Sequence, residues 1–126
     1  MISASKIQQL QYESDTWKRL LAFMVDESIH RKNRLVEILK KMSDKDVLVE
    51  AEKFQNRFLE QDNLIGLLRN EVAEFDRLLT REIFEDGKVI EAMDLKHKNI
   101  ETCFNTAKAK LEDLSRSFND YLLENS

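Results

Sequence analysis

The chain has 126 residues, a formal net charge of −4 at pH 7, 42% hydrophobic and 35% charged residues, one cysteine, two glycines and no proline. This length suits one domain with a modest core, which we predict to span residues 1–126. The scarcity of glycine and proline argues against a turn-rich all-β fold, and the composition argues against a disordered chain or a membrane protein.

Apolar residues recur in three stretches at alternating steps of three and four residues, which is typical of a helix with one buried seam. We therefore predict helices at about residues 5–42, 45–84 and 88–123. The first predicted seam is Ile7, Leu10, Ser14, Trp17, Leu21, Met24, Ser28, Arg31, Leu35, Ile38 and Met42. The second is Val47, Ala51, Phe54, Phe58, Gln61, Ile65, Leu68, Val72, Phe75, Leu79 and Glu82. The third is Ile90, Met93, His97, Ile100, Phe104, Ala107, Leu111, Leu114, Phe118 and Tyr121.

The residues between these seams support helix ends at the same places. Ser5 and Gln8 could form a capping box at the first start, and Ser43 or Asp44 could cap the second helix. Gly87 suits a left-handed helix stop. Because both connections are short, we predict an all-α fold with three long antiparallel helices in an up-down-up, coiled-coil-like bundle.

The charges agree with helices that pack against one another. Residues 1–43 carry a net charge of +3, residues 44–86 carry −6, and residues 87–126 carry −1. A basic first helix beside an acidic second helix is complementary within the fold. The simplest interpretation of these charges is the solvated flanks of a bundle.

An apolar girdle is predicted at mid-height. The run Leu20–Val25 covers the whole circumference of its helix, because six successive residues sweep more than one turn. If the two connections act as mirrors, this run lies level with Leu64–Leu68 and with the small residues Ala107 and Ala109. Not all of these side chains can point inward. We therefore predict an interaction patch of Phe23, Leu64 and Leu67.

Gly66 lies inside the same girdle. A glycine there would either allow a second helix to approach closely or simply weaken its own helix. The sequence leaves both interpretations open.

Two acid-x-x-His patterns occur, Glu27…His30 and Asp94…His97. Paired Glu-x-x-His motifs hold the metals of ferritin-like di-iron bundles, which these eight residues resemble. In the predicted bundle, however, the two patterns lie about 30 Å apart along the axis, at about 1.5 Å per residue. We therefore predict no metal site.

His97 falls on the third seam, so we interpret it as a core histidine that is hydrogen-bonded to Asp76, Glu13 or Ser14 and sets the helix register. Gln61, Arg31 and Ser28 interrupt the other seams, with Arg31 and Ser28 near the level of Ser115. These residues are predicted to form a polar layer that fixes register at some cost in stability.

The sequence gives little support for catalysis, phosphate binding or nucleic-acid binding. Cys103 has no predicted histidine beside it, and both glycines are isolated, so we expect no nucleophilic catalysis and no phosphate loop. The cluster His30–Arg34 resembles a phosphotransfer site, but Arg34 stands where a small residue is expected. The negative net charge does not favour nucleic-acid binding. No catalytic residue, cofactor or membrane segment is predicted.

These observations favour a non-enzymatic helical interaction or scaffold module, as a homodimer or bound to a partner protein helix. The alternative is a small helical metal-binding or phosphotransfer protein that uses His30 or His97; metal content or phosphate transfer to His30 would separate the two. The bundle and Trp17 resemble spectrin-type repeats in architecture only. With no leader sequence visible and one free thiol, we expect a cytoplasmic location.

Overall fold

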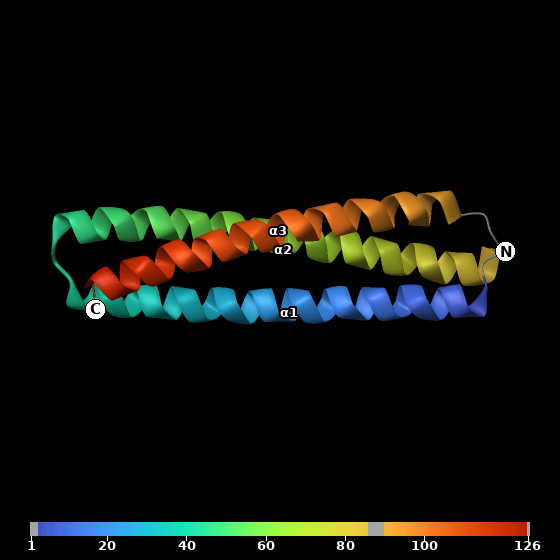
Figure 1. Cartoon of the computed structure of the whole chain (residues 1–126), viewed down its shortest axis with the longest axis horizontal. Helices are drawn as coiled ribbons and strands as arrows, with labels where there is room; N and C mark the ends of the chain where they lie inside the picture. The colour runs from blue at the N-terminus through green and yellow to red at the C-terminus, as the bar shows by residue number, and fades with distance from the viewer. Residues whose placement is uncertain (1–2, 86–89, 126) are drawn as a thin grey trace.

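The computed structural model describes residues 3–85 and 90–125. Helix α1 spans Ala4–Lys41, α2 spans Lys45–Glu85 and α3 spans Ile90–Asn125. Figure 1 shows the three helices side by side along one long axis, with successive helices running in opposite directions. The described residues contain no strand. The predicted all-α, up-down-up bundle is therefore confirmed.

The helix ends follow from local capping. The predicted Ser5–Gln8 capping box is wrong, because α1 begins earlier, where the Ser3 side chain accepts a hydrogen bond from the Lys6 amide at 3.1 Å. At the start of α2, Asp44 Oδ1 accepts from the amides of Asp46 (2.8 Å) and Val47 (3.4 Å), as the Ser43-or-Asp44 prediction allowed. Gly87, the predicted stop signal, lies outside the described residues.

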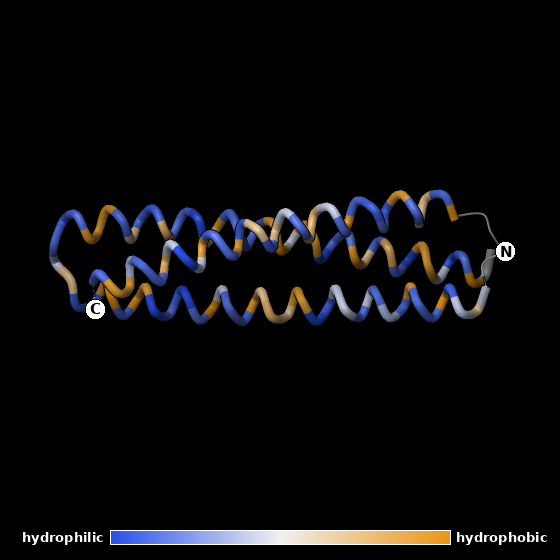
Figure 2. The backbone as a smooth tube through the Cα atoms, in the orientation of Figure 1, coloured by the Kyte–Doolittle hydropathy of each residue, from blue (hydrophilic) through white to orange (hydrophobic). Residues whose placement is uncertain are grey.

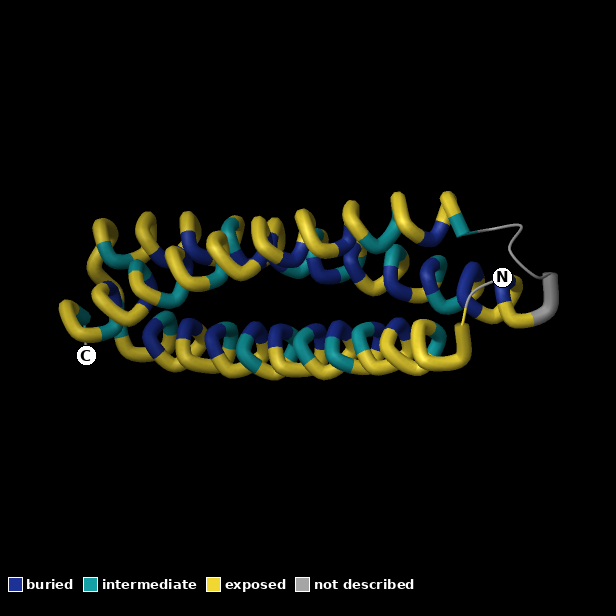
Figure 3. Tube along the Cα trace, turned by 45° about the vertical axis from the view of Figure 1, so that its right-hand side comes forward, coloured by how far each residue is buried: buried dark blue, intermediate teal, exposed yellow. Residues whose placement is uncertain are grey.

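The predicted seams form the inner faces of the bundle. None of the seam positions is exposed, and most are buried. Figure 3 shows the buried parts of the three helices turned toward one another, with exposed residues on the outside. Figure 2 shows the corresponding pattern in hydropathy: along every helix, hydrophobic residues recur at regular intervals between hydrophilic ones. A periodic stripe on each helix is therefore enough to build the core.

The core consists of two apolar clusters that follow one another along the axis. The larger cluster surrounds Trp17 and Phe75, and the smaller one surrounds Phe58 and Phe118. The buried members of the larger cluster are Leu10, Trp17, Leu21, Met24, Ile65, Leu68, Val72, Phe75, Leu78, Leu79, Met93, Ile100, Phe104 and Ala107. Those of the smaller cluster are Leu35, Ile38, Ala51, Phe54, Phe58, Leu114, Phe118 and Tyr121.

The helices do not contact one another equally. The backbone of α2 lies close to both α1 and α3, whereas the backbones of α1 and α3 scarcely approach each other. Contact between α1 and α3 runs instead through long side chains, such as Trp17 with Glu101 and Glu13 with His97. This spacing leaves room for a groove between α1 and α3.

Gly66 does not serve a close approach within the chain. A Cβ atom built on this residue would meet nothing within 4 Å. We expect Gly66→Ala to raise the free energy of unfolding by about 0.5–1 kcal/mol, because alanine restricts the unfolded chain and favours the helix interior. Urea unfolding followed by circular dichroism measures this change. A destabilised variant would show that Gly66 is needed for a contact.

Tyr121 gives the smaller cluster a dependence on alkaline pH. It is 5% exposed, its hydroxyl donates to the Val47 carbonyl at 3.0 Å, and burial, followed by the charge of Glu50, raises its pKa above the ordinary value of 10.0. The neutral phenol is thus favoured in the folded state. Its contribution to stability is complete below pH 10.0 and is lost as the pH rises through the higher folded pKa.

We expect Tyr121→Phe to lower the free energy of unfolding by about 0.5–1.5 kcal/mol at neutral pH, because the Val47 carbonyl loses the donor that the Tyr121 hydroxyl provides. The gap between the two proteins should close above pH 10, where the wild type alone loses the phenol contribution. Urea unfolding of both proteins between pH 7 and pH 11 measures the gap. A gap that is constant over this range would contradict the assigned role of the hydroxyl.

Candidate functional site: the polar layer and the grooves beside α3

Two matching ion-pair clusters connect α1 to α2. In the first, the Ser14 hydroxyl donates to Asp76, and Lys18 Nζ lies 2.6 Å from the same carboxylate. In the second, the Ser28 hydroxyl donates to Asp62 at 2.7 Å, and Lys32 pairs with that carboxylate. Each aspartate therefore receives a serine and a lysine that are one helical turn apart on α1. These clusters fix the relative height of α1 and α2.

At the height of the first cluster, the core is aromatic. Trp17 is 3% exposed and packs edge-on against Phe75, with ring centroids 5.1 Å apart. It also stacks on Phe104, at a centroid distance of 6.2 Å. Its indole N–H donates to Glu101 at 3.1 Å, so the one polar atom of the ring has a charged acceptor.

His97 lies beside this tryptophan and is partly buried. Its Nε2 is 2.7 Å from a carboxylate oxygen of Glu13, which is one of the partners that the sequence suggested. Its ring centroid is 5.3 Å from that of Trp17. His97 thus packs against Trp17 and Phe75 of the larger apolar cluster, at a different height from Arg31 and Gln61. Whether it sets the helix register stays a prediction.

At the height of the second cluster, the core is polar. Arg31 is 5% exposed and Gln61 is 4% exposed. Arg31 Nη1 donates to Ser115 Oγ at 3.4 Å and lies 3.8 Å from a carboxylate oxygen of Glu27. We use the name polar layer for Ser28, Arg31, Gln61, Asp62 and Ser115, which lie between the larger and the smaller apolar cluster.

Among the residues that the structure describes, three buried nitrogen atoms of the polar layer find no hydrogen-bond partner: Nε and Nη2 of Arg31, and Nε2 of Gln61. Burial lowers the pKa of Arg31, an effect that the charges of Glu27 and Asp62 oppose. All three atoms are donors, and a buried donor without an acceptor costs about 1–3 kcal/mol. The N–H groups of Arg31 and Gln61 could therefore donate hydrogen bonds to an acceptor that enters the polar layer.

The residues of the predicted interaction patch do not share one groove. Phe23, which is 58% exposed, lines a cavity of about 500 Å³ between α1 and α3, together with Leu111. Leu64 and Leu67 line a cavity of about 280 Å³ between α2 and α3, together with Lys110. Leu67 is 63% exposed, whereas Leu64 packs partly against the core. The structure thus brings Leu64 and Leu67 together and places Phe23 on the other side of α3, at a similar height.

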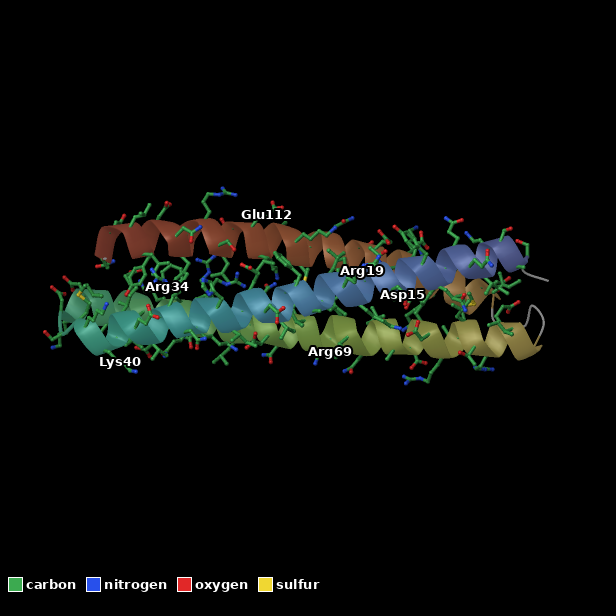
Figure 4. The ribbon with its side chains drawn as sticks, turned by 90° about the horizontal axis from the view of Figure 1, so that it is seen from below. Asp15, Arg19, Arg34, Lys40, Arg69 and Glu112 are labelled. Atoms are coloured by element: carbon green, nitrogen blue, oxygen red, sulfur yellow. The ribbon has the colours of Figure 1, made fainter. Side chains whose placement is uncertain are left out.

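A second, smaller cavity of about 120 Å³ continues the α1–α3 groove past Arg31. His30 and Arg34 line it from α1, and Asn119 lines it from α3. Figure 4 shows Arg34 on the side of α1 that faces α3, with Glu112 on α3 and Arg69 on the outer side of α2. Arg31 lines both cavities, so it forms the floor between them.

The described residues do not bring together three or more histidine, cysteine, aspartate or glutamate side chains that could hold a metal ion. His30 is exposed in the α1–α3 groove, whereas His97 is paired with Glu13. Cys103 is a free, exposed thiol. None of the helices within residues 3–85 and 90–125 combines the length and apolar character that a membrane crossing requires.

Comparisons with protein-family models, with curated proteins and with solved structures find no match to this chain.

Proposed function

We propose that this protein is a non-enzymatic helical interaction module that self-associates through the interaction patch of Phe23, Leu64 and Leu67. The observation that carries the proposal is the exposure of two large apolar side chains, Phe23 (58%) and Leu67 (63%), on the rims of two grooves. Burying each of them in an interface would stabilise it by about 1.5–3 kcal/mol. We also propose a reducing, cytoplasmic location, in which exposed Cys103 remains a thiol.

The position of the patch favours a second copy of the same chain as the partner. Both grooves reach residues 110–114 of α3, so Phe23 and Leu67 lie at one height on opposite sides of this helix. A two-fold axis parallel to α3, between the α3 helices of two copies, would place Phe23 of each copy opposite Leu67 of the other. In such a symmetric interface both copies contribute the same surface. A helix from a different protein is the alternative occupant of the grooves.

We expect the double substitution Phe23→Glu and Leu67→Glu to convert a dimer into a monomer without unfolding it, because both side chains point away from the core. Light scattering during size exclusion measures the mass, and circular dichroism monitors the helix content. The matched control is Leu123→Glu, since Leu123 is 79% exposed on α3 and lines neither groove. A dimer that survives the double substitution would contradict the assigned patch.

A further inference from the structure

Helix α1 contains an internal repeat with a period of 14 residues. The pattern Glu-Ser-x-x-(Trp or Arg)-Lys-x-x-Leu occurs twice, at residues 13–21 and at residues 27–35. The serine and lysine of each copy contact one aspartate of α2, as described above. The serine and lysine contacts of the two copies are therefore equivalent in three dimensions as well as in sequence. Among the buried positions of the pattern, the copies differ at the central one, which is Trp17 in the first copy and Arg31 in the second.

The equivalence extends to α3. Trp17 donates to Glu101, and Arg31 donates to Ser115; in both contacts the two residues are 84 positions apart in the chain. Ser115 thus occupies the place that Glu101 occupies one repeat earlier. The tryptophan, with one donor, faces a carboxylate. The arginine, with a full positive charge and five donors, faces a short neutral hydroxyl.

The part of Arg31 that lacks a partner has a specific shape. Nη1 is engaged by Ser115 and lies near Glu27, whereas Nε and Nη2 are both without a partner. Nε and Nη2 form one edge of the planar guanidinium, with two parallel N–H bonds. This is the fork that binds the two oxygen atoms of a carboxylate or phosphate. A single water or hydroxyl oxygen cannot satisfy both donors with equally good geometry.

The surroundings of the fork favour an anion that enters from the α1–α3 groove. Arg31 forms the floor of this groove, which is also lined by the cations Arg34 and Arg116 and by His30. Arg34 lies within 3.3 Å of Glu37, and Glu27 and Glu112 also line the groove, so its walls carry both signs of charge. An extended polyanion does not match this pattern, because the acidic side chains of the walls would repel it. A ligand with a single carboxylate directed at Arg31 does match it.

We propose that the α1–α3 groove binds one carboxylate group of a ligand on the Nε–Nη2 edge of Arg31, the counterpart of the Glu101 carboxylate one repeat earlier. Binding requires a small movement of Arg31 toward the groove, because the unpartnered atoms are buried. The site can be tested separately from the proposed self-association, since it depends on Arg31 and not on Leu67, although Phe23 lines the same groove. The carboxylate comes from a free small acid or from an acidic side chain of a protein helix, and the probes below distinguish the two.

In the first test, a substitution introduces the carboxylate into α3, next to Arg31. Ser115→Glu should raise the midpoint of thermal unfolding by several degrees, because the new side chain can reach Arg31 as Glu101 reaches Trp17. The same substitution in an Arg31→Leu background should give no increase. Ser117→Glu is the matched control, since Ser117 lines a cavity on the α2 side of α3. An equal effect of Ser115→Glu in both backgrounds would overturn the proposal.

The second test does not depend on the folding of that variant. The N–H signal of Arg31 Nε in a ¹⁵N-labelled sample should shift when sodium acetate replaces sodium chloride at constant ionic strength. Arg31→Lys keeps the charge but removes the fork, and thermal unfolding of that variant should not respond to acetate. Arg69→Lys is the matched control and should respond like the wild type, because Arg69 lies on the outer side of α2, away from the groove. An Arg31 signal that acetate leaves unchanged would refute the site.

The source of the carboxylate is found with a third probe, an amphipathic helical peptide with one central glutamate between leucines. A shift at much lower concentrations of this peptide than of acetate, lost when its glutamate is replaced by glutamine, identifies a protein side chain. Equal responses to acetate and to both peptides identify a free acid. The Leu67→Glu variant should respond as the wild type does, so loss of self-association and loss of the carboxylate site are measured separately.

Discussion

Replacing Trp17 with alanine is expected to cause the largest loss of stability of any substitution considered for this bundle. The indole ring is 3% exposed and contacts Phe75 and Phe104 within the larger apolar cluster. Its removal opens a cavity between all three helices and leaves the Glu101 carboxylate without its donor. Truncations of this size cost about 3–5 kcal/mol, which corresponds to a decrease in Tm of about 10 °C or more.

Thermal and urea unfolding followed by circular dichroism measure this loss. Tyr12→Ala is the matched control, because Tyr12 also lies on α1 but is 66% exposed. Its effect should stay within about 0.5 kcal/mol. Trp17→Phe separates the two contributions, since it retains most of the ring packing but removes the indole N–H. A loss below 1 kcal/mol for Trp17→Ala, within the range of ordinary surface substitutions, would contradict the central packing role of this residue.

The second large effect has the opposite sign. We expect the double substitution Arg31→Leu and Gln61→Leu to raise the free energy of unfolding by about 1–4 kcal/mol, because replacing buried charged groups with well-packed apolar residues is often stabilising. The substitution removes three buried donors without partners and joins the two apolar clusters into one. Nη1 of Arg31 loses a long contact of 3.4 Å to Ser115 and a long ion pair of 3.8 Å with Glu27.

The same urea titration measures this gain, with Arg34→Leu as the control on the adjacent turn of α1. Arg34 is an exposed residue that pairs with Glu37 on the surface of α1, so its replacement should change stability little. A polar layer that fixes helix register should also make the substituted bundle less uniquely packed, with broader amide signals in NMR spectra. A large decrease in Tm would show that the layer stabilises the fold, contrary to expectation.

The sequence predicts well which residues face the bundle axis and which face outward, because burial in a bundle follows the heptad period of the helix. The polar positions Ser14, Ser28, Arg31 and Gln61 were assigned to the seam from spacing alone, and all four are buried. The height of neighbouring helices is less accurate. The mirror construction places Ser28 opposite Phe58, whereas its partner is Asp62, about one turn further along α2.

The sequence did not predict which groove each exposed residue would line. Periodicity gives the angle of Phe23 on α1, but the side of α3 on which it lies depends on how the three helices are arranged around their common axis. The prediction therefore combined Phe23 with Leu64 and Leu67, although α3 separates them. The repeat at residues 13–21 and 27–35 was visible in the sequence and was missed. An alignment of α1 with itself at a shift of 14 residues would have indicated the equivalence of Trp17 and Arg31.

The solution mass of the untagged protein tests the proposed self-association most directly. Light scattering during size exclusion should give a mass of about twice 14.9 kDa at every concentration tested, and Phe23→Glu with Leu67→Glu should reduce it to 14.9 kDa with unchanged helix content. A wild-type protein with the mass of a single chain across the whole concentration range would contradict self-association through this patch.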